Sequence, residues 1–162
     1  ESYKIGRTIR VNNSSVYRCV DIVKRKNDGE TDYAIIKLDR PVKDRLPLKL
    51  SRKTHVTKKT QLTLVGHPSG LPVKVAPNAR VIKPNISKTY FIANTDSFAG
   101  NSGSPVLHSQ TGEVEGILVR GEEDYRTVKR NGKRCLVPVV CTTQDHCKGE
   151  AVMKMSHLLD FL

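Results

Sequence analysis

The chain has 162 residues, with 28 Lys and Arg against 16 Asp and Glu, 37% hydrophobic residues and four cysteines. This size and composition are typical of a globular protein with a buried core and exclude a disordered tail. No apolar run approaches the roughly 20 residues that span a bilayer, and no basic-then-apolar leader opens the chain. We therefore expect neither a membrane-spanning helix nor a signal peptide in this sequence.

The excess of basic residues gives a net charge of +12, which would suit a protein that binds nucleic acid. These residues gather in short clusters at positions 24–26, 52–53, 58–59, 129–130 and 133–134. The clusters lie in turn-like stretches without an RNA-binding aromatic motif, a zinc-finger spacing or a recognition helix beside them. We interpret the charge as a solvated basic surface, which argues against a nucleic-acid partner.

The hydrophobic residues come mostly in short runs separated by Gly, Pro, Asn and Asp, a pattern typical of an all-β protein. It predicts strands at residues 16–23, 33–38, 61–65, 80–83, 90–93, 105–108, 114–119 and 136–140. From Glu150 onward, hydrophobic residues recur at helical spacing, at Val152, Met155, Leu158, Leu159 and Leu162. This predicts a short C-terminal α-helix whose apolar face packs on the β-strands.

The stretch 40–60 is polar and basic, contains two prolines and shows little periodicity. It divides the chain into a short N-terminal piece and a longer C-terminal piece. We expect a first domain at residues 1–45, a connection between domains at residues 46–60, and a second domain at residues 61–162.

The most informative stretch is Gly-Asn-Ser-Gly-Ser-Pro-Val at positions 100–106. Gly100 and Gly103 allow backbone conformations and a close approach of substrate that a Cβ atom would block. In such a turn the N–H groups of Gly100 and Ser102 can point at one spot and stabilise the oxyanion of an acyl-transfer intermediate. The simpler interpretation is an ordinary loop rich in Gly, Ser and Pro.

A second candidate is Asp32, which opens a strand of nearly continuous apolar residues. A carboxylate at the start of a buried strand needs a hydrogen-bond donor, and the Nδ1–H of a catalytic histidine is one such donor. Taken alone, Asp32 would be interpreted as a capping or turn residue.

Taken together with the stretch from Gly116 to Gly121, these motifs resemble the chymotrypsin/trypsin family of serine endopeptidases, in particular its bacterial secreted members. The resemblance implies a double β-barrel with a short C-terminal helix, and in this chain an incomplete first barrel. It implies that Ser102 is the nucleophile, that Gly100 and Ser102 supply the oxyanion N–H groups, and that Asp32 is the orienting acid.

The same resemblance implies protein or peptide substrates, a covalent acyl-enzyme, no metal and no organic cofactor. It also implies a secreted or periplasmic location. The family holds the loop of the nucleophile with an aspartate in its zymogen-type members, but this chain has Asn101 there. A neutral amide cannot pair with a new N-terminal ammonium, so we expect hydrogen bonds to hold the loop instead.

The chain departs from the family in one decisive respect: no histidine precedes Asp32, although the family order is His, Asp, Ser. A general base must reach hydrogen-bond distance of the serine hydroxyl, and none of the histidines present is well placed along the chain to do so: His55, His67, His108, His146 and His157. We expect this chain to be the C-terminal portion of an endopeptidase, inactive alone, with the histidine on a missing N-terminal segment or a separate chain.

The resemblance also places Asp96 at the base of the primary specificity pocket and Gly121 at its mouth. A buried carboxylate there would favour Arg or Lys substrate side chains, because each partner would otherwise leave a charge unpaired. Leu118 stands where glutamate-cutting relatives carry a histidine, which argues against acidic substrates. The alternative is that Asp96 faces solvent or a loop N–H.

The four cysteines, Cys19, Cys135, Cys141 and Cys147, allow three disulfide pairings, of which Cys141–Cys147 would close a short loop. A metal site that includes His146 is disfavoured, because the spacing lacks the hairpin usual for zinc. The alternative function is an inactive protease-fold module whose basic surface binds an anionic partner.

Overall fold

The structure is a computed structural model that describes residues 8, 10–142 and 147–161, with the side chain of residue 160 excepted. His146 and Leu162, both considered above, lie outside the described residues. The chain divides into two compact units. One comprises Glu1–Arg25 and Ala34–Leu46, and the other Lys26–Tyr33 and Pro47–Leu162. The expected domain boundaries at 45 and 61 stay a prediction.

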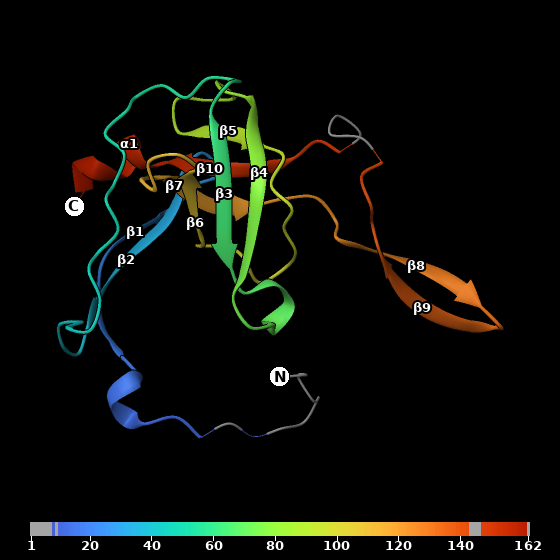
Figure 1. Ribbon diagram of the computed structural model, residues 1–162, viewed down its shortest axis with the longest axis horizontal. Coiled ribbons are helices and arrows are strands. Elements are labelled where there is room, and N and C mark those ends of the chain that lie inside the picture. The colour runs from blue at the N-terminus through green and yellow to red at the C-terminus, as the bar shows by residue number, and fades with distance from the viewer. Residues whose placement is uncertain (1–7, 9, 143–146, 162) are drawn as a thin grey trace. The chain divides into compact units, whose positions relative to one another are not determined.

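The larger unit is built around a closed six-stranded antiparallel barrel, with the strand order β10-β5-β4-β3-β6-β7 (Figure 1). Its strands are β3 (Gln61–Gly66), β4 (Lys74–Lys83), β5 (Tyr90–Ala93), β6 (Pro105–His108), β7 (Val114–Arg120) and β10 (Glu150–Lys154). Closure removes every unpaired sheet edge from the barrel. The predicted all-β class is therefore confirmed.

The barrel encloses a continuous apolar core. In β3, burial alternates along the strand, so that Leu62 and Leu64 point inward. They pack with Phe91, Val106 and Val152, each fully buried. Val56, from the segment before β3, completes the cluster. At about 1.5–3 kcal/mol for each buried large side chain, this core is a principal source of the unit's stability.

The C-terminal helix is shorter than predicted, because residues 150–154 form strand β10 rather than helix. β10 pairs with both β5 and β7, for example Val152 with Phe91 on one side and Leu118 on the other. Pairing on both edges satisfies the backbone hydrogen-bonding groups of β10 and closes the barrel. The spacing of hydrophobic residues within this segment does not reveal these pairings, because they involve strands that are distant in sequence. The helix itself is α1 (Met155–Leu158), followed by the 3-10 turn η3 (Leu159–Phe161).

The remaining elements lie outside the barrel sheet. They are η1 (Asn13–Ser15), β1 (Cys19–Asn27), β2 (Asp32–Leu38), η2 (Pro68–Gly70), β8 (Tyr125–Arg130) and β9 (Lys133–Pro138). β1 pairs with β2, and β8 pairs with β9 through an Asn131-Gly132 turn with positive φ at both positions. Strand β8 was not predicted, because its residues are largely polar and stay exposed, so no apolar run marks it.

The described part of the smaller unit is held by Arg40. Its guanidinium donates to the carbonyl oxygens of Asn13, Ser14 and Val16 at 3.3, 2.7 and 2.9 Å. It also pairs with the Asp39 carboxylate at 2.8 Å. One planar cation thus ties η1 to the end of β2, which suits the fixed fork of donors that a guanidinium carries.

One of the disulfide pairings left open by the sequence is present: Cys141 is bonded to Cys147, with a Cα–Cα distance of 5.8 Å. Cys19 and Cys135 are free thiols. Within the described residues, no helix combines the length and the apolar character needed to cross a membrane.

Candidate active site

The loop that carries Ser102 is a tight turn between Asp96 and β6. Gly100 and Gly103 adopt φ values of +95° and +84°, a region that favours glycine. Around them, the amide of Asn101 donates to the Phe98 carbonyl at 3.2 Å, and the amide of Ser104 donates to the Asn101 carbonyl at 2.9 Å. The turn exposes Ser102 at its apex while its neighbour Asn101 is only 3% exposed.

Strand β7 holds this turn from the other side. The Gly103 amide donates to the Leu118 carbonyl at 2.7 Å, and the Leu118 amide donates back to the Ser104 carbonyl at 2.9 Å. The Ser102 hydroxyl donates to the Val119 carbonyl at 3.2 Å. The position of the candidate nucleophile is thus set by backbone groups of a barrel strand, which makes it insensitive to side-chain motion.

Asn101 directly precedes Ser102, at the position where a loop held by an ion pair with an N-terminal ammonium would need an aspartate. Its side-chain amide donates to the Ser97 hydroxyl at 3.1 Å, and its buried Oδ1 has no hydrogen-bond partner in the described residues. A Cβ built at Gly66 would overlap the Asn101 side chain, so glycine at the end of β3 makes room for it. The loop is held by hydrogen bonds and packing.

The two amides expected to form the oxyanion hole belong to Gly100 and Ser102. Within the described residues, neither has a hydrogen-bond partner, whereas the amides of Asn101, Gly103 and Ser104 all do. Unpaired N–H groups in a preorganised turn are the arrangement that stabilises a developing oxyanion. Gly100 also packs against η2, where a Cβ would lie 3.3 Å from the His67 carbonyl oxygen.

Asp32, the candidate orienting acid, begins β2 between two buried anchors. Thr31 is 3% exposed and Tyr33 stacks on the Phe161 ring with centroids 5.3 Å apart. Asp32 itself is half-buried. Its negative charge acts on Tyr90: burial raises the pKa of Tyr90, Arg120 opposes this rise, and Asp32 adds to it.

The segment just before Asp32 is fixed to the barrel within the same unit. The Thr89 hydroxyl donates to the Glu30 carbonyl at 2.6 Å, and the Arg120 guanidinium donates to the Gly29 carbonyl at 2.9 Å. These bonds come from residues next to β5 and at the end of β7. The acid is therefore placed by the barrel that carries Ser102.

No histidine of the described residues is hydrogen bonded to Ser102 or Asp32. His67 Nδ1 bonds to the Leu71 carbonyl oxygen at 3.1 Å, and His108 Nδ1 accepts from the Gln110 amide at 3.3 Å. His157 stands edge-on to Phe161. Ser102 and Asp32 are thus present without a general base from these side chains.

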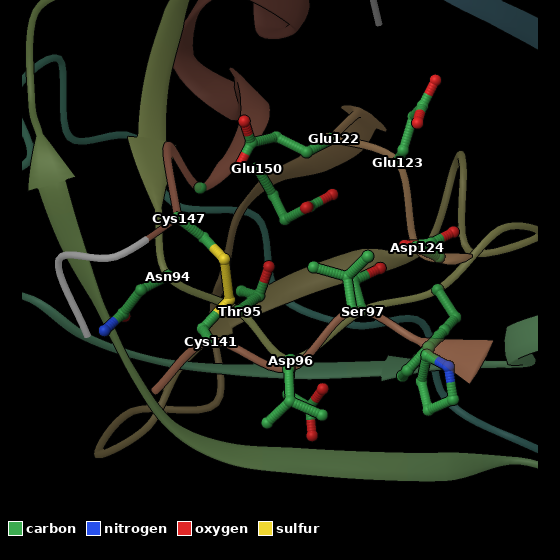
Figure 2. A pocket seen from close by; sticks show the side chains of 15 residues that line it. Asn94, Thr95, Asp96, Ser97, Glu122, Glu123, Asp124, Cys141, Cys147 and Glu150 are labelled. Atoms are coloured by element: carbon green, nitrogen blue, oxygen red, sulfur yellow. A yellow bond between two sulfur atoms is a disulfide. The ribbon is translucent and has the colours of Figure 1, made fainter. Parts of the chain in front are cut away.

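Beside the nucleophile loop lies a pocket of about 810 Å³ (Figure 2). It is lined by residues from parts of the chain that are far apart in sequence: residues 94–98, residues 122–124, residues 138–141, and residues 147, 149 and 150, with the Cys141–Cys147 disulfide. Five carboxylates line it, those of Asp96, Glu122, Glu123, Asp124 and Glu150. No Lys, Arg or His of the described residues does so.

The structure places the two residues expected in the specificity pocket differently. Asp96 lines the pocket, but its side chain is exposed. Gly121 lies against Glu150, because a Cβ built on Gly121 would overlap the Glu150 carboxylate. Burial raises the pKa of Glu150 to about 7, and the neighbouring charges of Asp124 and Glu122 add to this rise. A hydrogen bond from the Glu122 backbone opposes it.

Sequence reasoning missed Glu150, Asp124 and Glu122, because residues from 150 onward were interpreted as helix and β8 was not recognised. One signal was available. The run Gly-Glu-Glu-Asp at positions 121–124 places three acids together directly after β7, in a chain whose net charge is +12. Such a concentration against the overall charge is a reason to look for a cation site.

A family model described as trypsin-like peptidase domain matches residues 7–117, more than two thirds of the chain and a stretch that contains Asp32 and Ser102. No curated protein matches the sequence significantly.

Among solved structures, the chain is similar to a serine-to-alanine mutant of Rv3671c from M. tuberculosis H37Rv in an inactive form. This match has a TM-score of 0.58 and 15% identity, and covers 91% of this chain and 64% of that one. A structure of the Rv3671c protease in an inactive form matches with a TM-score of 0.53 and 16% identity. This match covers 83% of this chain and 60% of that one. Kallikrein-related peptidase 10 matches with a TM-score of 0.58 and 15% identity over 90% and 70%.

These similarities confirm the chymotrypsin-like fold, with an incomplete first barrel. The chain spans less than two thirds of the length of both Rv3671c structures.

Proposed function

Because this chain belongs to the trypsin-like peptidase domain family, we propose that it is the nucleophile-bearing part of a serine endopeptidase. The observation that carries the proposal is the Ser102 turn, in which the amides of Gly100 and Ser102 have no partner in the described residues. Both residues are exposed, so these two amides are open to a substrate oxygen, while the amides around them are held within the fold.

In the proposed reaction, the Ser102 oxygen attacks the carbonyl carbon of a peptide bond, and its proton passes to a histidine. The amides of Gly100 and Ser102 bind the oxyanion of the tetrahedral intermediate. The histidine returns the proton to the leaving amine as the C–N bond breaks, which leaves an acyl group on Ser102. Water then attacks the acyl group by the same route and regenerates the serine.

The histidine is proposed to come from an N-terminal segment or a separate chain. Asp32 would accept the Nδ1–H of that histidine and hold its ring toward Ser102. Asp32 is suited to this, because it is half-buried and the described residues around it leave it without a paired cation. The 162-residue chain alone is then inactive, although its nucleophile and oxyanion donors are in place.

A fluorophosphonate probe tests this assignment, since it reacts with a serine that a base activates. We expect the full-length protein to be labelled at Ser102 and the chain alone to be labelled on the order of a hundredfold or more slowly. Ser102→Ala should abolish the labelling, whereas Ser109→Ala, at an exposed serine just after β6, is the matched control.

Strong labelling of Ser102 in the chain alone would contradict the absence of a base. Failure to label the full-length protein would favour the alternative, an inactive module that binds an anionic partner through its basic surface.

We further propose that the enzyme cuts after Arg or Lys and works outside the cytoplasm. The acidic pocket, which is lined in part by residues 96–98 of the loop that carries Ser102, supports the first point, because it would pair with a basic substrate side chain. The Cys141–Cys147 disulfide supports the second, since disulfides persist in oxidising compartments.

If Asp96 is the acid of the pocket, Asp96→Ala in the full-length enzyme removes the preference for Arg and Lys in a peptide-library assay. Retention of that preference would overturn the assignment to Asp96.

A further inference from the structure

The pocket is acidic, although the chain as a whole has a net charge of +12. Five of the 16 acidic residues of the chain line it, while none of the 28 Lys and Arg does so within the described residues. Like charges repel, so a group of carboxylates of which only Glu122 has an ammonium beside it, that of Lys148, lowers the stability of the folded chain. A bound cation would relieve this cost. The question is which carboxylate would hold it.

Two of the five carboxylates already accept hydrogen bonds from backbone amides of the chain. Asp124 accepts a hydrogen bond from the Ala99 amide at 2.6 Å and so fixes the segment before the nucleophile loop. Glu122 accepts from the Lys148 amide at 2.7 Å and lies 3.5 Å from the Lys148 ammonium. Both bonds tie the pocket walls together. Of the remaining acids, Asp96 and Glu123 are exposed.

Glu150 differs from the others in position. It is half-buried at the start of β10, where the strand register pairs it with Ala93, and its carboxylate lies directly against Gly121. Gly121 closely follows Val119, whose carbonyl oxygen accepts the Ser102 hydroxyl. The Glu150 carboxylate therefore lies against a residue two positions along the chain from the one that fixes the Ser102 hydroxyl. The Glu122 backbone is its hydrogen-bond donor, and no basic side chain of the described residues pairs with it.

A second, independent observation is a buried hydroxyl of the pocket that has no hydrogen-bond partner in the described residues. The Thr95 side chain is 7% exposed, and its hydroxyl has no hydrogen-bond partner in the described residues. Thr95 lines the pocket together with the disulfide (Figure 2). A buried hydroxyl without a partner costs free energy unless a ligand supplies one.

We infer that Glu150, rather than Asp96, is the residue that binds the cationic group of the substrate side chain, with the Thr95 hydroxyl as a second acceptor. The ligand class is a guanidinium, amidinium or primary ammonium on an apolar stem. The stem would lie along the apolar residues of the pocket, which include Phe98, Val139 and the disulfide. This inference rests on the proposed function, in that it takes the pocket as the site of the substrate side chain.

The physical preference for Glu150 follows from burial. A charge pair is screened strongly when its carboxylate faces bulk water, as that of Asp96 does, and less so when the carboxylate is partly buried. Burial also makes the unoccupied carboxylate costly, which the raised pKa of Glu150 reflects. A neutral or acidic substrate side chain would leave that cost in place, whereas a cation removes it. Discrimination between substrates therefore depends on the buried acid.

Binding of benzamidine, a small aromatic amidinium, tests the inference on the 162-residue chain without any need for catalysis. We expect binding at about pH 8, measured by NMR titration or calorimetry, and no binding of the uncharged analogue benzamide. Glu150→Gln should weaken binding by about tenfold or more, Asp96→Asn by about threefold or less, and Thr95→Val by a few-fold. Glu113→Gln, the same change in the turn between β6 and β7, is the matched control.

The inference is overturned if the wild-type chain does not bind benzamidine, or if Asp96→Asn weakens binding more than Glu150→Gln does. Glu150→Gln is nearly isosteric and removes a repulsive charge, so we expect it to fold; circular dichroism of each variant checks this.

The result is separate from the proposed activity. Loss of benzamidine binding with Ser102 still labelled in the full-length protein would reject the role of Glu150 alone. Binding without labelling of the full-length protein would reject the endopeptidase and leave a cation-binding pocket.

Discussion

Two regions of the larger unit carry opposite charges and tolerate them in different ways. The acidic pocket contributes five carboxylates and no basic residue of the described chain. The β8–β9 hairpin, Tyr125 to Pro138, contributes five cations and no acid, namely Arg126, Lys129, Arg130, Lys133 and Arg134. In the hairpin, Lys129 faces Arg134 and Arg130 faces Lys133 across the ladder.

The difference between them lies in exposure to water. All five hairpin cations are exposed, so solvent and salt screen their repulsion, and none forms an ion pair within the described residues. In the pocket, Glu150 is half-buried, and its pKa rises to about 7. An equal number of like charges therefore leaves the hairpin merely basic, but makes the pocket a place where a ligand of opposite charge is favoured.

The largest expected effect comes from charge reversal. Glu150→Lys should weaken benzamidine binding by about a hundredfold or more, or roughly 2.7 kcal/mol, because it places a cation where the ligand's cation binds. Arg130→Glu, the reversal in the hairpin, should change binding by less than about twofold, since screening weakens the interaction of exposed charges. Calorimetric titration of both variants measures this. Equal losses would show that long-range charge, rather than the pocket, governs binding.

The next effect concerns the disulfide that lines the pocket. Replacing both Cys141 and Cys147 with serine should lower the free energy of unfolding by about 2 kcal/mol, because the bond closes a short loop in the unfolded chain. Cys135→Ser, which removes the free thiol of the hairpin, should change it by less than about 0.5 kcal/mol. Urea unfolding of both variants provides the comparison. A double variant as stable as the wild type would mean that the disulfide does not stabilise the folded chain.

Stability should also depend on pH through Glu150. The pKa of a glutamate is ordinarily 4.5 and that of Glu150 is about 7 in the folded chain, so between these values the folded state holds a proton that the unfolded state has lost. Stability therefore falls as pH rises from 4.5 toward 7. Allowing for solvent screening of a half-exposed group, we expect a loss of about 1–2 kcal/mol.

Glu150→Gln should remove this fall, as measured by urea unfolding at several pH values. The charged groups that face Glu150 are Asp124 and Glu122, the latter paired with Lys148, so Asp124→Asn should reduce the fall without abolishing it. An unchanged pH profile in Glu150→Gln would show that another group is responsible.

The smallest effect lies in the hairpin. Arg134→Glu turns the Lys129–Arg134 pair into an attractive one, and we expect a gain of about 0.5 kcal/mol at low salt. Arg134→Gln, which only removes the repulsion, should give about half of this gain. Thermal unfolding at low and high salt measures both, and the gain should vanish at about 1 M salt. A gain that survives high salt would point to packing rather than charge.

Prediction from sequence succeeded where the chemistry is local. Glycines at positions 100 and 103 indicated a turn with positive φ, and the structure has φ of +95° and +84° there. Strands with an apolar run were found, such as β3 and β5, because alternation reports which side of a strand is buried. Asp32 was placed at the start of a strand, and β2 begins at that residue.

Prediction failed where distant segments decide the outcome. Residues 150–154 carry helical spacing but form a strand, because the barrel needs a partner for both β5 and β7. The assignment of Asp96 as the acid of the pocket stays a prediction. The structure adds that Asp96 lines the pocket and is exposed, whereas Glu150 is half-buried and its carboxylate lies against Gly121. The sequence also left the disulfides open: Cys141 is bonded to Cys147, while Cys19 and Cys135 are free thiols.

The sequence by itself therefore determined the class of fold, the turn that carries Ser102 and the family of the chain, since these depend on neighbouring residues and on alternation within single strands. Only the tertiary structure decided which carboxylate the pocket buries. The reason is physical: the environment of a charge depends on what packs around it, and here the walls come from residues about position 95, about 123 and about 150. The composition gives a net charge of +12 but does not show that five of the 16 acidic residues line one pocket, which depends on the fold.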